Sequence, residues 1–419
     1  MSDQIPEGWR VGALSEFADI NPKLKNDVPL TDDLLVSFIK MEDVSNNAQV
    51  IRKHVRKYSD VAKGFTKFND NDVLVAKITP CFENGKGGYA TNLLNGIGFG
   101  STEFHVLRAK ENSDSKYIYQ YTNFDRFRLA AEASMCGTGG QRRVQTDFVK
   151  THKTQFPPLP EQQKIAKILT SVDEVIEKTQ AQIDKLKDLK TGMMQELLTQ
   201  GVGVDGKPHT EFKDSPVGRI PKVWDLEPLA NFTTFISYGF TNPMPEAEVG
   251  PYMITAKDVN DLKVQYSTAR KTTQEAFDNL LTRKSRPQVN DILLTKDGTL
   301  GRVALVTDSN CCINQSVAVL TPNERVIPKF LLYLLASPRY QQEMLENAGG
   351  STIKHIYITV VDKMLVGVPS LIEQQKLVDI FDSVFRKLEL TENKLSKLKD
   401  TKKALMQDLL TGKVRVNIE

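Results

Sequence analysis

Residues 161–199 read EQQKIAKILTSVDEVIEKTQAQIDKLKDLKTGMMQELLT, and apolar side chains recur along them at alternating steps of four and three. This spacing is typical of the seam of a coiled-coil helix. The seam consists of Ile165, Leu169, Val172, Ile176, Ile183, Leu186, Met193 and Leu197, with polar interruptions at Thr179 and Lys190. At roughly 1.5 Å per residue the helix would be a rod about 55 Å long. Such a rod needs a partner helix, because no single small domain can cover it.

The partner helix is in the same chain, because the seam recurs at a constant shift of 212 positions. The second copy consists of Leu377, Phe381, Val384, Leu388, Leu395, Leu398, Leu405 and Leu409, with polar interruptions again at Thr391 and Lys402. The entry EQQK at 161–164 also recurs at 373–376, in both cases after a proline-containing approach. A shared register that includes the polar interruptions indicates an internal repeat.

The segment before each helix is duplicated as well. Ile5-Pro6 with Trp9 matches Ile220-Pro221 with Trp224 at a shift of 215. The expected buried strand at 72–77 is mirrored at 291–296, and the glycine-rich stretch 137–142 is mirrored at 349–354. Further expectations for the first copy are strands over 36–41 and 104–107, loops among the glycines between 85 and 100, and helical structure over 117–133.

These patterns predict an α/β (α+β) fold with a pseudo-two-fold internal repeat. Two similar mixed α/β domains would be separated by two long helices that form an antiparallel coiled coil. The predicted parts are domain 1 (1–157), the central helix (158–200), a polar linker (201–218), domain 2 (219–369) and the C-terminal helix (370–412). Antiparallel pairing is expected because a parallel arrangement would require the linker to retrace the whole rod. The two domains would then be held about 40 to 60 Å apart.

Length and composition are those of an ordinary soluble protein with more than one domain. The 419 residues suffice for two or three domains, and 40% hydrophobic with 26% charged residues is ordinary for a soluble chain. No signal-peptide or membrane-span pattern is present, so we expect a cytoplasmic protein. The four cysteines and five histidines show no paired metal-ligand spacing, so neither a metal site nor a disulfide is expected.

Charge is informative through its distribution, because the net charge of +3 is small. Basic residues gather at 52–57, at Arg142 and Arg143, and at Arg283, Lys284 and Arg286. For each group considered alone, a solvated face is the ordinary interpretation. We found no convincing catalytic set, and the glycine loop at 137–143 lacks the ending of a phosphate-binding loop. The chain is therefore expected to perform no bond chemistry.

The ordered repeats resemble the specificity subunit of type I restriction-modification enzymes. The resemblance rests on the opening Ile220-Pro221 to Trp224, the run KDGTLG at 296–301, the run GSTIK at 350–354, the run from Pro369 to EQQ at 373–375, and the closing LLTG at 409–412. It covers nearly the whole chain. The first half departs from the pattern at 139–141 and carries an insertion between Lys77 and Gly85.

The resemblance implies a non-catalytic reader of double-stranded DNA that recognises an asymmetric, two-part sequence. Each domain would be a target recognition domain for one half. The helices would set the gap and dock two methyltransferase subunits, through which restriction and translocase subunits would join. No cofactor is expected in this chain, because S-adenosylmethionine, ATP and Mg would bind only the partner subunits. No membrane partner is expected.

Residues in loops that can contact phosphates or base edges are the candidate DNA-binding residues. The candidates are Lys77, Lys86, Gln141, Arg142 and Arg143 in the first domain, and Lys296, Arg302, Gln315, Ser351, Thr352, Lys354 and His355 in the second. Arg142 and Arg143 are the preferred pair, because guanidinium groups on a glycine-rich loop can approach a groove closely.

Two other functions remain open from the sequence. The scaffold could serve as an orphan DNA-binding protein, or with a fused methyltransferase-nuclease, outside a type I system. It could also be a coiled-coil interaction scaffold that binds no nucleic acid. A neighbouring methyltransferase gene would separate the first possibility from a specificity subunit, and a steep salt dependence of DNA binding would exclude the second.

Overall fold

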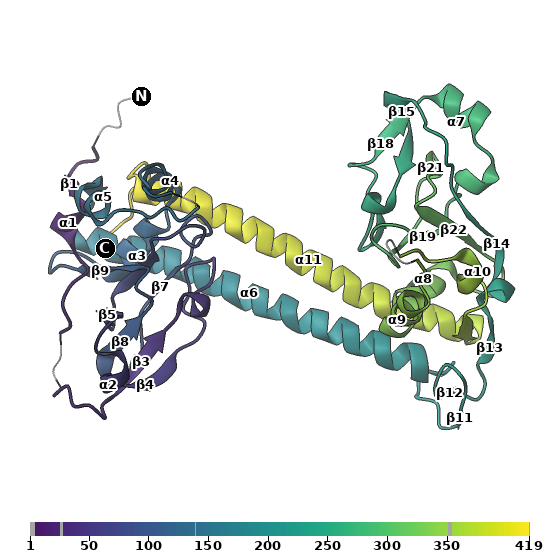
Figure 1. The fold of residues 1–419 in the computed structure, drawn as a ribbon, viewed down its shortest axis with the longest axis horizontal. Helices are drawn as coiled ribbons and strands as arrows, with labels where there is room; N and C mark the ends of the chain where they lie inside the picture. Colours follow the sequence, from purple (N-terminus) through teal and green to yellow (C-terminus); the bar gives the residue numbers. More distant parts are fainter. Residues whose placement is uncertain (1–4, 26–27, 139, 351–353, 419) are drawn as a thin grey trace. The chain divides into compact units, whose positions relative to one another are not determined.

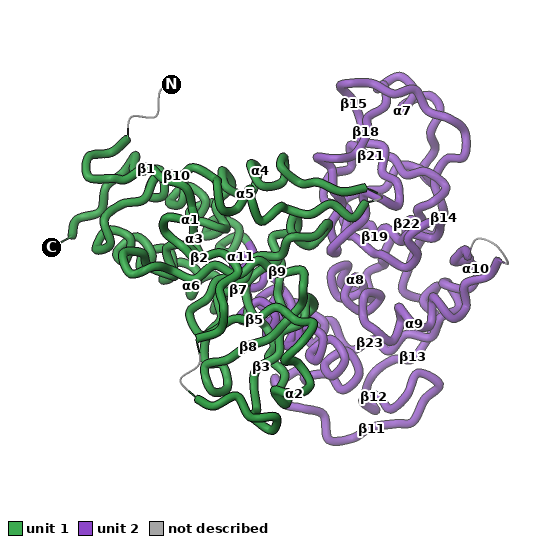
Figure 2. The backbone as a smooth tube through the Cα atoms, turned by 60° about the vertical axis from the view of Figure 1, so that its left-hand side comes forward, with its two compact units in different colours: residues 1–181, 393–419 green, residues 182–392 purple. Residues whose placement is uncertain are grey.

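The computed structural model describes residues 5–25, 28–138, 140–350 and 354–418. The chain divides into two compact units, which are unit 1 (residues 1–181 and 393–419) and unit 2 (residues 182–392) (Figure 2). Figure 1 labels two long helices, α6 (Leu159–Gln200) and α11 (Leu371–Leu410). Both contribute residues to both units. Each unit therefore contains the first part of one long helix and the last part of the other.

The two long helices pack in opposite directions. Side chains near the start of α6 and the end of α11 share the core of unit 1, namely Ile165, Ala166, Leu169, Met406, Leu409 and Leu410. Side chains near the end of α6 and the start of α11 share the core of unit 2, namely Met194, Leu198, Leu377, Val378 and Phe381. The start of one helix thus meets the end of the other in each unit, which confirms the predicted antiparallel pairing.

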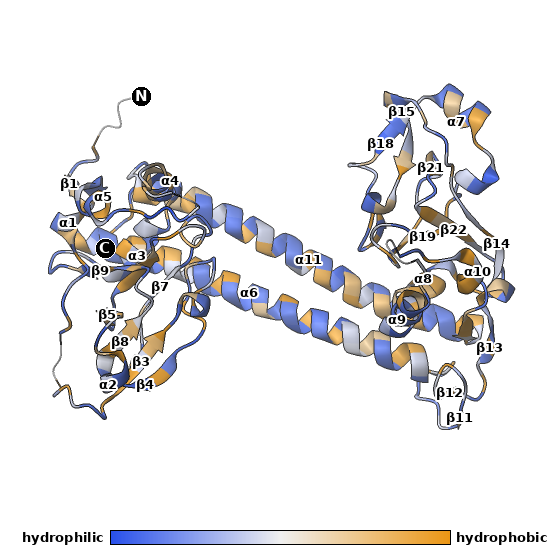
Figure 3. Cartoon of the chain, viewed as in Figure 1, coloured by the Kyte–Doolittle hydropathy of each residue, from blue (hydrophilic) through white to orange (hydrophobic). Residues whose placement is uncertain are grey.

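Every predicted seam position of both helices is buried or half-buried. Apolar residues form interrupted stripes between hydrophilic residues along both helices (Figure 3). The polar interruptions Thr179 and Thr391 are buried, and each hydroxyl donates to a carbonyl of its own helix at 2.7 Å. Within the described ranges, no helix is both long and apolar enough to span a lipid bilayer.

Unit 1 contains a mixed α/β domain ahead of α6. Its strands are β1 (Arg10–Ala13), β2 (Ala18–Ile20), β3 (Leu35–Ile39), β4 (His54–Lys57), β5 (Thr66–Asn69), β6 (Val73–Ala76), β7 (Gly87–Tyr89), β8 (Ile97–Gly100), β9 (Phe104–Ala109) and β10 (Lys153–Phe156). Its helices are α1 (Leu14–Phe17), α2 (Tyr58–Val61), α3 (Ser115–Thr122), α4 (Asp125–Ala133) and α5 (Thr146–Thr151). The strands form two four-stranded sheets, ordered β2-β9-β6-β7 and β4-β3-β8-β5, and the ribbon β1-β10.

Unit 2 contains the second mixed α/β domain. Its strands are β11 (Phe212–Lys213), β12 (Ile220–Pro221), β13 (Asp225–Pro228), β14 (Thr233–Tyr238), β15 (Glu246–Ile254), β16 (Val259–Asn260), β17 (Leu262–Val264), β18 (Arg270–Thr272), β19 (Ile292–Thr295), β20 (Val303–Leu305), β21 (Cys311–Ile313), β22 (Val317–Pro322) and β23 (Leu365–Val368). Its helices are α7 (Gln274–Leu280), the 3-10 turn η5 (Arg283–Ser285), α8 (Pro328–Ala336), α9 (Pro338–Glu346) and α10 (Ile358–Val361).

The sheet topology repeats between the units. The order β2-β9-β6-β7 in unit 1 corresponds to β14-β22-β19-β20 in unit 2, where β17 and β16 extend the sheet. The parallel pair β3 and β8 corresponds to the parallel pair β15 and β21. The antiparallel ribbon β1-β10 corresponds to β13-β23. This repeat, together with the helix pair, confirms the predicted fold class.

The prediction of loops among the glycines between 85 and 100 is wrong in part, because β7 and β8 lie there. These glycines allow strands and side chains to approach closely. A Cβ atom on Gly98 would lie 2.1 Å from the Phe68 ring, and one on Gly87 would lie 2.6 Å from the carbonyl oxygen of Leu74. Glycine inside a strand often marks such a close approach, and the sequence pattern alone does not separate it from a loop.

The predicted helical segment 117–133 is divided into α3 and α4. The chain turns at Asn123 and Phe124, where Phe124 has an extended backbone with ψ of 134°. The turn brings both Tyr121 and Phe127 into the core of unit 1, with ring centroids 5.8 Å apart. In unit 2, Ser337 separates α8 from α9 with a similar extended backbone.

The segment 201–218, predicted as a linker, is attached to unit 2 along its length. Near its start, the backbone N–H groups of Val202 and Gly203 donate to the Glu373 carboxylate at 3.0 and 3.1 Å. Near its end, β11 pairs with β12 in an antiparallel ribbon. It is therefore an ordered part of unit 2, while the predicted domain boundaries stay predictions.

Candidate nucleic-acid interface

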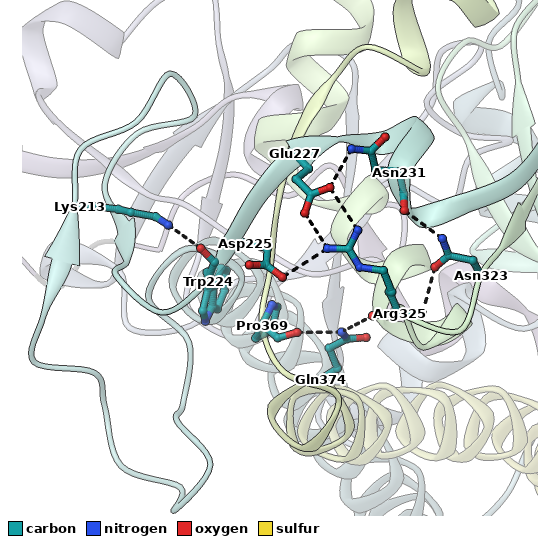
Figure 4. A network of polar contacts seen from close by, with 9 residues as sticks. All are labelled: Lys213, Trp224, Asp225, Glu227, Asn231, Asn323, Arg325, Pro369 and Gln374. Atoms are coloured by element: carbon teal, nitrogen blue, oxygen red, sulfur yellow. Dashed lines mark hydrogen bonds and ion pairs between the residues drawn. The ribbon is translucent and has the colours of Figure 1, made fainter.

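One buried glutamine connects each mixed α/β domain to its long helix. In unit 2, Gln374 is fully buried, and its amide oxygen accepts from the N–H of Ile327, the residue before α8, at 2.7 Å. Its amide nitrogen donates to the carbonyl groups of Arg325 and Pro369 at 3.0 and 2.9 Å (Figure 4). All three contacts are backbone groups, so Gln374 joins the β23–α11 turn to the domain without depending on neighbouring side chains.

Unit 1 repeats this joint with Gln162. Its amide oxygen accepts from the N–H of Asp114, the residue before α3, at 2.9 Å. Its amide nitrogen donates to the carbonyl groups of Pro157 and Asn112 at 2.8 and 3.3 Å. The partners lie at equivalent positions of the repeat, so the same chemistry positions both domains on their helices.

Around the unit 2 joint, the Arg325 side chain adds a network of ion pairs and hydrogen bonds. Its guanidinium pairs with Glu227 at 2.6 Å and with Asp225 at 3.4 Å, and Asn231 also donates to Glu227 (Figure 4). These hydrogen bonds, with the Arg325 contact the largest, lower the pKa of Glu227 to about 2. The equivalent position in unit 1 is Asn112, which has no charge.

A buried glutamate beside each glutamine contacts the segment that follows the opposite long helix. In unit 1, Glu161 accepts from the Trp9 indole at 3.1 Å and from the Arg415 guanidinium at 2.7 and 2.8 Å. In unit 2, the equivalent Glu373 accepts from His209 at 2.8 Å. Trp224 instead buries an indole N–H for which the described part of the chain supplies no acceptor.

The candidate DNA-binding residues lie mainly where the central strand of each domain ends. In unit 1, β6 ends before Lys77, whose carbonyl accepts from the N–H of Val144 at 2.9 Å. In unit 2, β19 ends before Lys296, whose carbonyl accepts from the N–H of Ile356 at 3.0 Å. This shared backbone contact draws the loop before Val144, or before Ile356, onto the end of the strand.

That loop is closed in the same way in both units. In unit 1, Cys136 and Arg143 exchange backbone hydrogen bonds of 3.1 and 2.9 Å. In unit 2, Gly349 and His355 exchange backbone hydrogen bonds of 3.0 and 2.8 Å. Arg143 and His355 therefore occupy equivalent positions, and each lies one residue before the backbone contact with the central strand.

In unit 1, carboxylates hold the preferred pair of arginines. Arg143 forms a forked hydrogen bond with Glu103, with contacts between 2.9 and 3.2 Å, which raises its pKa. Arg142 lies 3.4 Å from Glu83, which also accepts from the Thr79 hydroxyl at 2.8 Å. We call Lys77, Glu83, Glu103, Arg142 and Arg143 cluster 1. The side chains of Arg142 and Arg143 remain 47 and 38% exposed.

His105 contacts the backbone next to Arg143 of cluster 1. It is 2% exposed, and its Nε2 atom lies 2.8 Å from the carbonyl oxygen of Val144. Burial is the largest influence and lowers the pKa of His105, and Lys77 adds to the lowering. The imidazole is therefore favoured in its neutral form and donates from Nε2 to hold Val144 against the strand.

In unit 2, the corresponding side chains share one carboxylate. Asp297 pairs with the Lys296 ammonium at 2.6 Å and with the His355 imidazole. Burial pushes the pKa of Asp297 upward, but the hydrogen bonds from Lys296 and His355 outweigh it and leave the pKa lowered. The carboxylate is therefore charged near neutral pH and holds two positive or polar donors at the loop surface.

Two further segments meet this group. The Lys296 ammonium lies 5.8 Å from the ring centroid of Tyr238, at the end of β14. The backbone N–H of Gln315 donates to the carbonyl of Phe240 at 2.8 Å, two residues beyond Tyr238. We call Tyr238, Lys296, Asp297, Gln315 and His355 cluster 2.

The other candidates are not brought into either cluster. The Lys86 ammonium donates to the Met41 carbonyl at 2.9 Å, so it closes a loop within the domain. Arg302 directly follows the 296–301 turn, and its guanidinium lies 3.5 Å from the Val259 carbonyl oxygen. Gln141 and Lys354 are exposed on the two loops. Ser351 and Thr352 lie outside the described residues.

Sequence reasoning missed the carboxylates Glu83, Glu103 and Asp297 and the aromatic Tyr238. Asp297 could have been found, because it follows Lys296 directly and stands in the run KDGTLG at the end of a predicted strand. Glu103 is 40 residues from its partner Arg143, so no local pattern connects them. No group of three or more possible metal-ligating His, Cys, Asp or Glu side chains occurs among the described residues.

Fold and site together define a duplicated protein in which one scaffold, built twice, carries two unlike polar clusters. A family model for the type I restriction modification DNA specificity domain matches residues 6–188 and 245–400. The chain belongs to this family.

Curated relatives match parts or all of the chain. The type I restriction enzyme EcoAI specificity subunit of Escherichia coli is 39% identical over 164 residues, which are 39% of this chain and 27% of that protein. The EcoEI specificity subunit of the same species is 34% identical over 44% of this chain and 32% of its own length. The matches thus span only 27 and 32% of these two relatives. The putative MjaX specificity subunit of Methanocaldococcus jannaschii is 26% identical over 99% of this chain and 95% of that protein.

Solved structures share the fold. A chain from a structural study of complex assembly and conformational transition of the type I restriction-modification system is 17% identical, with a TM-score of 0.57 over 98% of this chain and 100% of that chain. The S subunit of the type I restriction-modification system from M. genitalium is 14% identical, with a TM-score of 0.55 over 98% of this chain and 97% of that chain.

Proposed function

We propose that the chain is the DNA-specificity subunit of a type I restriction-modification system and that it recognises an asymmetric, two-part DNA sequence. The single observation that carries this proposal is the contrast within the repeat. Gln162 and Gln374 join the domains to their helices through equivalent contacts, whereas clusters 1 and 2 present different side chains at equivalent places. Two unlike reading surfaces on one duplicated scaffold suit a target with two different halves.

The clusters offer the chemistry that base reading needs. Arginine can donate two hydrogen bonds to the major-groove edge of guanine, so Arg143 suits a guanine in the half-site read by unit 1. A carboxylate can accept from the amino group of cytosine, and Asp297 holds such a carboxylate beside Lys296 and His355. Glu103 and Asp297 would keep their basic partners oriented before DNA arrives.

The partners follow from the same proposal. Two methyltransferase subunits would dock on the chain, and restriction and translocase subunits would join through them. The chain itself would perform no bond chemistry, since its clusters combine donors and acceptors without a nucleophile and base in catalytic arrangement. S-adenosylmethionine, ATP and Mg would bind in the partner subunits. This assignment is supported by relatives named as specificity subunits.

The test uses the full chain purified with a methyltransferase subunit from the same source cell. Genomic DNA lacking modification is methylated by the complex, and the modified positions are mapped by sequencing. The proposal predicts one motif with two unlike specified halves and an unspecified gap of constant length. Methylation without such a motif, or no binding of the complex to duplex DNA at low salt, would contradict it.

A further inference from the structure

The basic group Arg283, Lys284 and Arg286 separates into different roles in the structure. Arg283 pairs with the buried Asp291 at 3.1 Å and donates to the Thr321 hydroxyl at 2.8 Å. Arg286 donates to the Phe277 carbonyl and covers the Phe277 ring at 4.5 Å. Both arginines are thus occupied in holding unit 2 together.

Lys284 is different, because it is exposed and has no hydrogen-bond or ion-pair partner in the part of the chain that the structure describes. Its ammonium lies 6.0 Å from the ring centroid of Tyr238. The Lys296 ammonium lies 5.8 Å from the same centroid. Two ammonium groups from separate segments, η5 and the end of β19, therefore approach one aromatic ring that is 43% exposed.

The charges around this ring are unbalanced. Asp297 is the carboxylate that pairs with Lys296, and it also pairs with His355. Lys284 adds a positive charge that no described carboxylate neutralises by contact. Concentrated positive charge beside an exposed aromatic ring attracts a polyanion. Lysine and the tyrosine hydroxyl are both regular donors to phosphate oxygens of DNA.

The described part of unit 1 differs at the position equivalent to Tyr238. Ile20 and Ile236 occupy equivalent places in the two sheets, because they pair with Leu107 and Leu320 respectively. Counting onward from these positions places Pro22 where unit 2 has Tyr238. Proline offers neither an aromatic ring nor a hydroxyl donor, so Pro22 cannot make the contacts that Tyr238 makes in unit 2.

We propose that Tyr238, a member of cluster 2, and the neighbouring Lys284 form a sequence-independent contact with the DNA phosphate backbone in unit 2, while the other members of cluster 2 read bases. This inference rests on the proposed function and adds to it a role that differs between the two units. Lys284 supplies charge, and Tyr238 supplies a hydroxyl donor together with a surface that orients both lysines. Affinity for DNA of any sequence would therefore depend on these residues.

The test measures binding of the full chain with its methyltransferase to a random-sequence 40-base-pair duplex over a range of salt concentrations. Replacing Lys284→Ala should lower the salt slope of the binding constant by about one. The resulting affinity deficit should be about three- to fourfold larger at about 50 mM than at about 200 mM salt. Tyr238→Leu should weaken binding about two- to fivefold, while Tyr238→Phe isolates the contribution of the hydroxyl.

The matched control is Lys222→Ala, because Lys222 is equally an exposed lysine of unit 2 but pairs with Glu211 at 3.1 Å. Its salt slope should equal that of the unchanged protein. Tryptophan fluorescence checks that each variant is folded. An unchanged slope for folded Lys284→Ala would overturn this inference and leave the proposed function standing. Failure of the unchanged complex to bind duplex DNA would instead overturn the proposed function and the inference with it.

Discussion

The two units differ least where buried backbone groups must be satisfied and most where side chains meet solvent. Gln162 and Gln374 contact equivalent backbone groups in both units. The residues before the central-strand contact are instead an arginine paired with Glu103 in unit 1 and a histidine paired with Asp297 in unit 2. A buried amide that connects several segments admits few substitutes, whereas a loop that only has to close can carry different side chains.

The largest expected effect concerns the joints. Gln374→Leu would leave the Ile327 N–H and two carbonyl groups buried without partners, which costs about 3 to 5 kcal/mol of unfolding free energy. The loss is measured by urea unfolding of unit 2, followed by Trp224 fluorescence in a Trp9→Phe background. Gln162→Leu, followed by Trp9 in a Trp224→Phe background, should show a loss of similar size. A loss below about 1 kcal/mol in either unit would contradict the equivalence of the joints.

The next effect concerns the difference between the clusters. Replacing Arg142 and Arg143 together with Ala should weaken binding to the recognised sequence by about 1 to 3 kcal/mol for each lost base contact. The measurement is a titration of the complex with labelled duplex at several salt concentrations. Lys86→Ala is the control, because Lys86 is tied to the Met41 carbonyl and should leave the affinity unchanged. Unchanged binding of the double variant would exclude cluster 1 from the DNA contact.

A third effect distinguishes the units by their response to acid. Burial lowers the pKa of His105 and of His152, both in unit 1. Above a pH of about 6.5 these histidines are neutral in both the folded and the unfolded state, so they do not reduce stability. Below that pH the unfolded state binds protons more readily than the folded state, so the free energy of unfolding falls. The urea midpoint of unit 1, read from Trp9, should therefore decrease between pH 7.5 and 5.5. His105→Gln should reduce this decrease, and an identical decrease in the variant would contradict the assignment.

The smallest effect concerns the polar seam positions of the long helices. In unit 1, Lys402 pairs with Asp173 at 2.7 Å, whereas in unit 2 the equivalent Lys190 lies 4.2 Å from the ring centroid of Phe385. Lys402→Met should destabilise unit 1 by about 1 kcal/mol, because a half-buried carboxylate loses its cation. Lys190→Met should be close to neutral, because methionine packs well on an aromatic ring. Thermal unfolding of both variants tests the contrast, and equal losses would refute it.

The sequence was sufficient to predict the helices and the repeat because their signals are local and periodic. The seam positions follow one another at three or four residues, and their polar interruptions recur at the same register. The strands β6 and β19 were equally visible as matching apolar runs. Gly87 and Gly98 misled the prediction, because a glycine that allows close packing looks the same as one in a loop.

The sites could be predicted only in part. The candidates Lys77, Lys296 and His355 follow from the strand ends and the repeated loop, which are local features. Their partners do not, because the tertiary fold brings Glu103 to Arg143 across 40 positions and Asp297 to His355 across 58. Tyr238 was the hardest residue to predict, because only the tertiary fold brings Lys284 of η5 and Lys296 after β19 to its ring.

The most direct test of two unlike reading clusters is a half-site specificity profile. The complex is bound to duplex libraries randomised in one half of the recognised sequence at a time, for the unchanged chain and for Arg143→Lys and His355→Gln. Lysine keeps the charge of Arg143 but loses its forked donor, so only the half read by unit 1 should become more permissive. His355→Gln should relax only the other half. Relaxation of the same half by both variants, or of both halves by either one, would contradict the account.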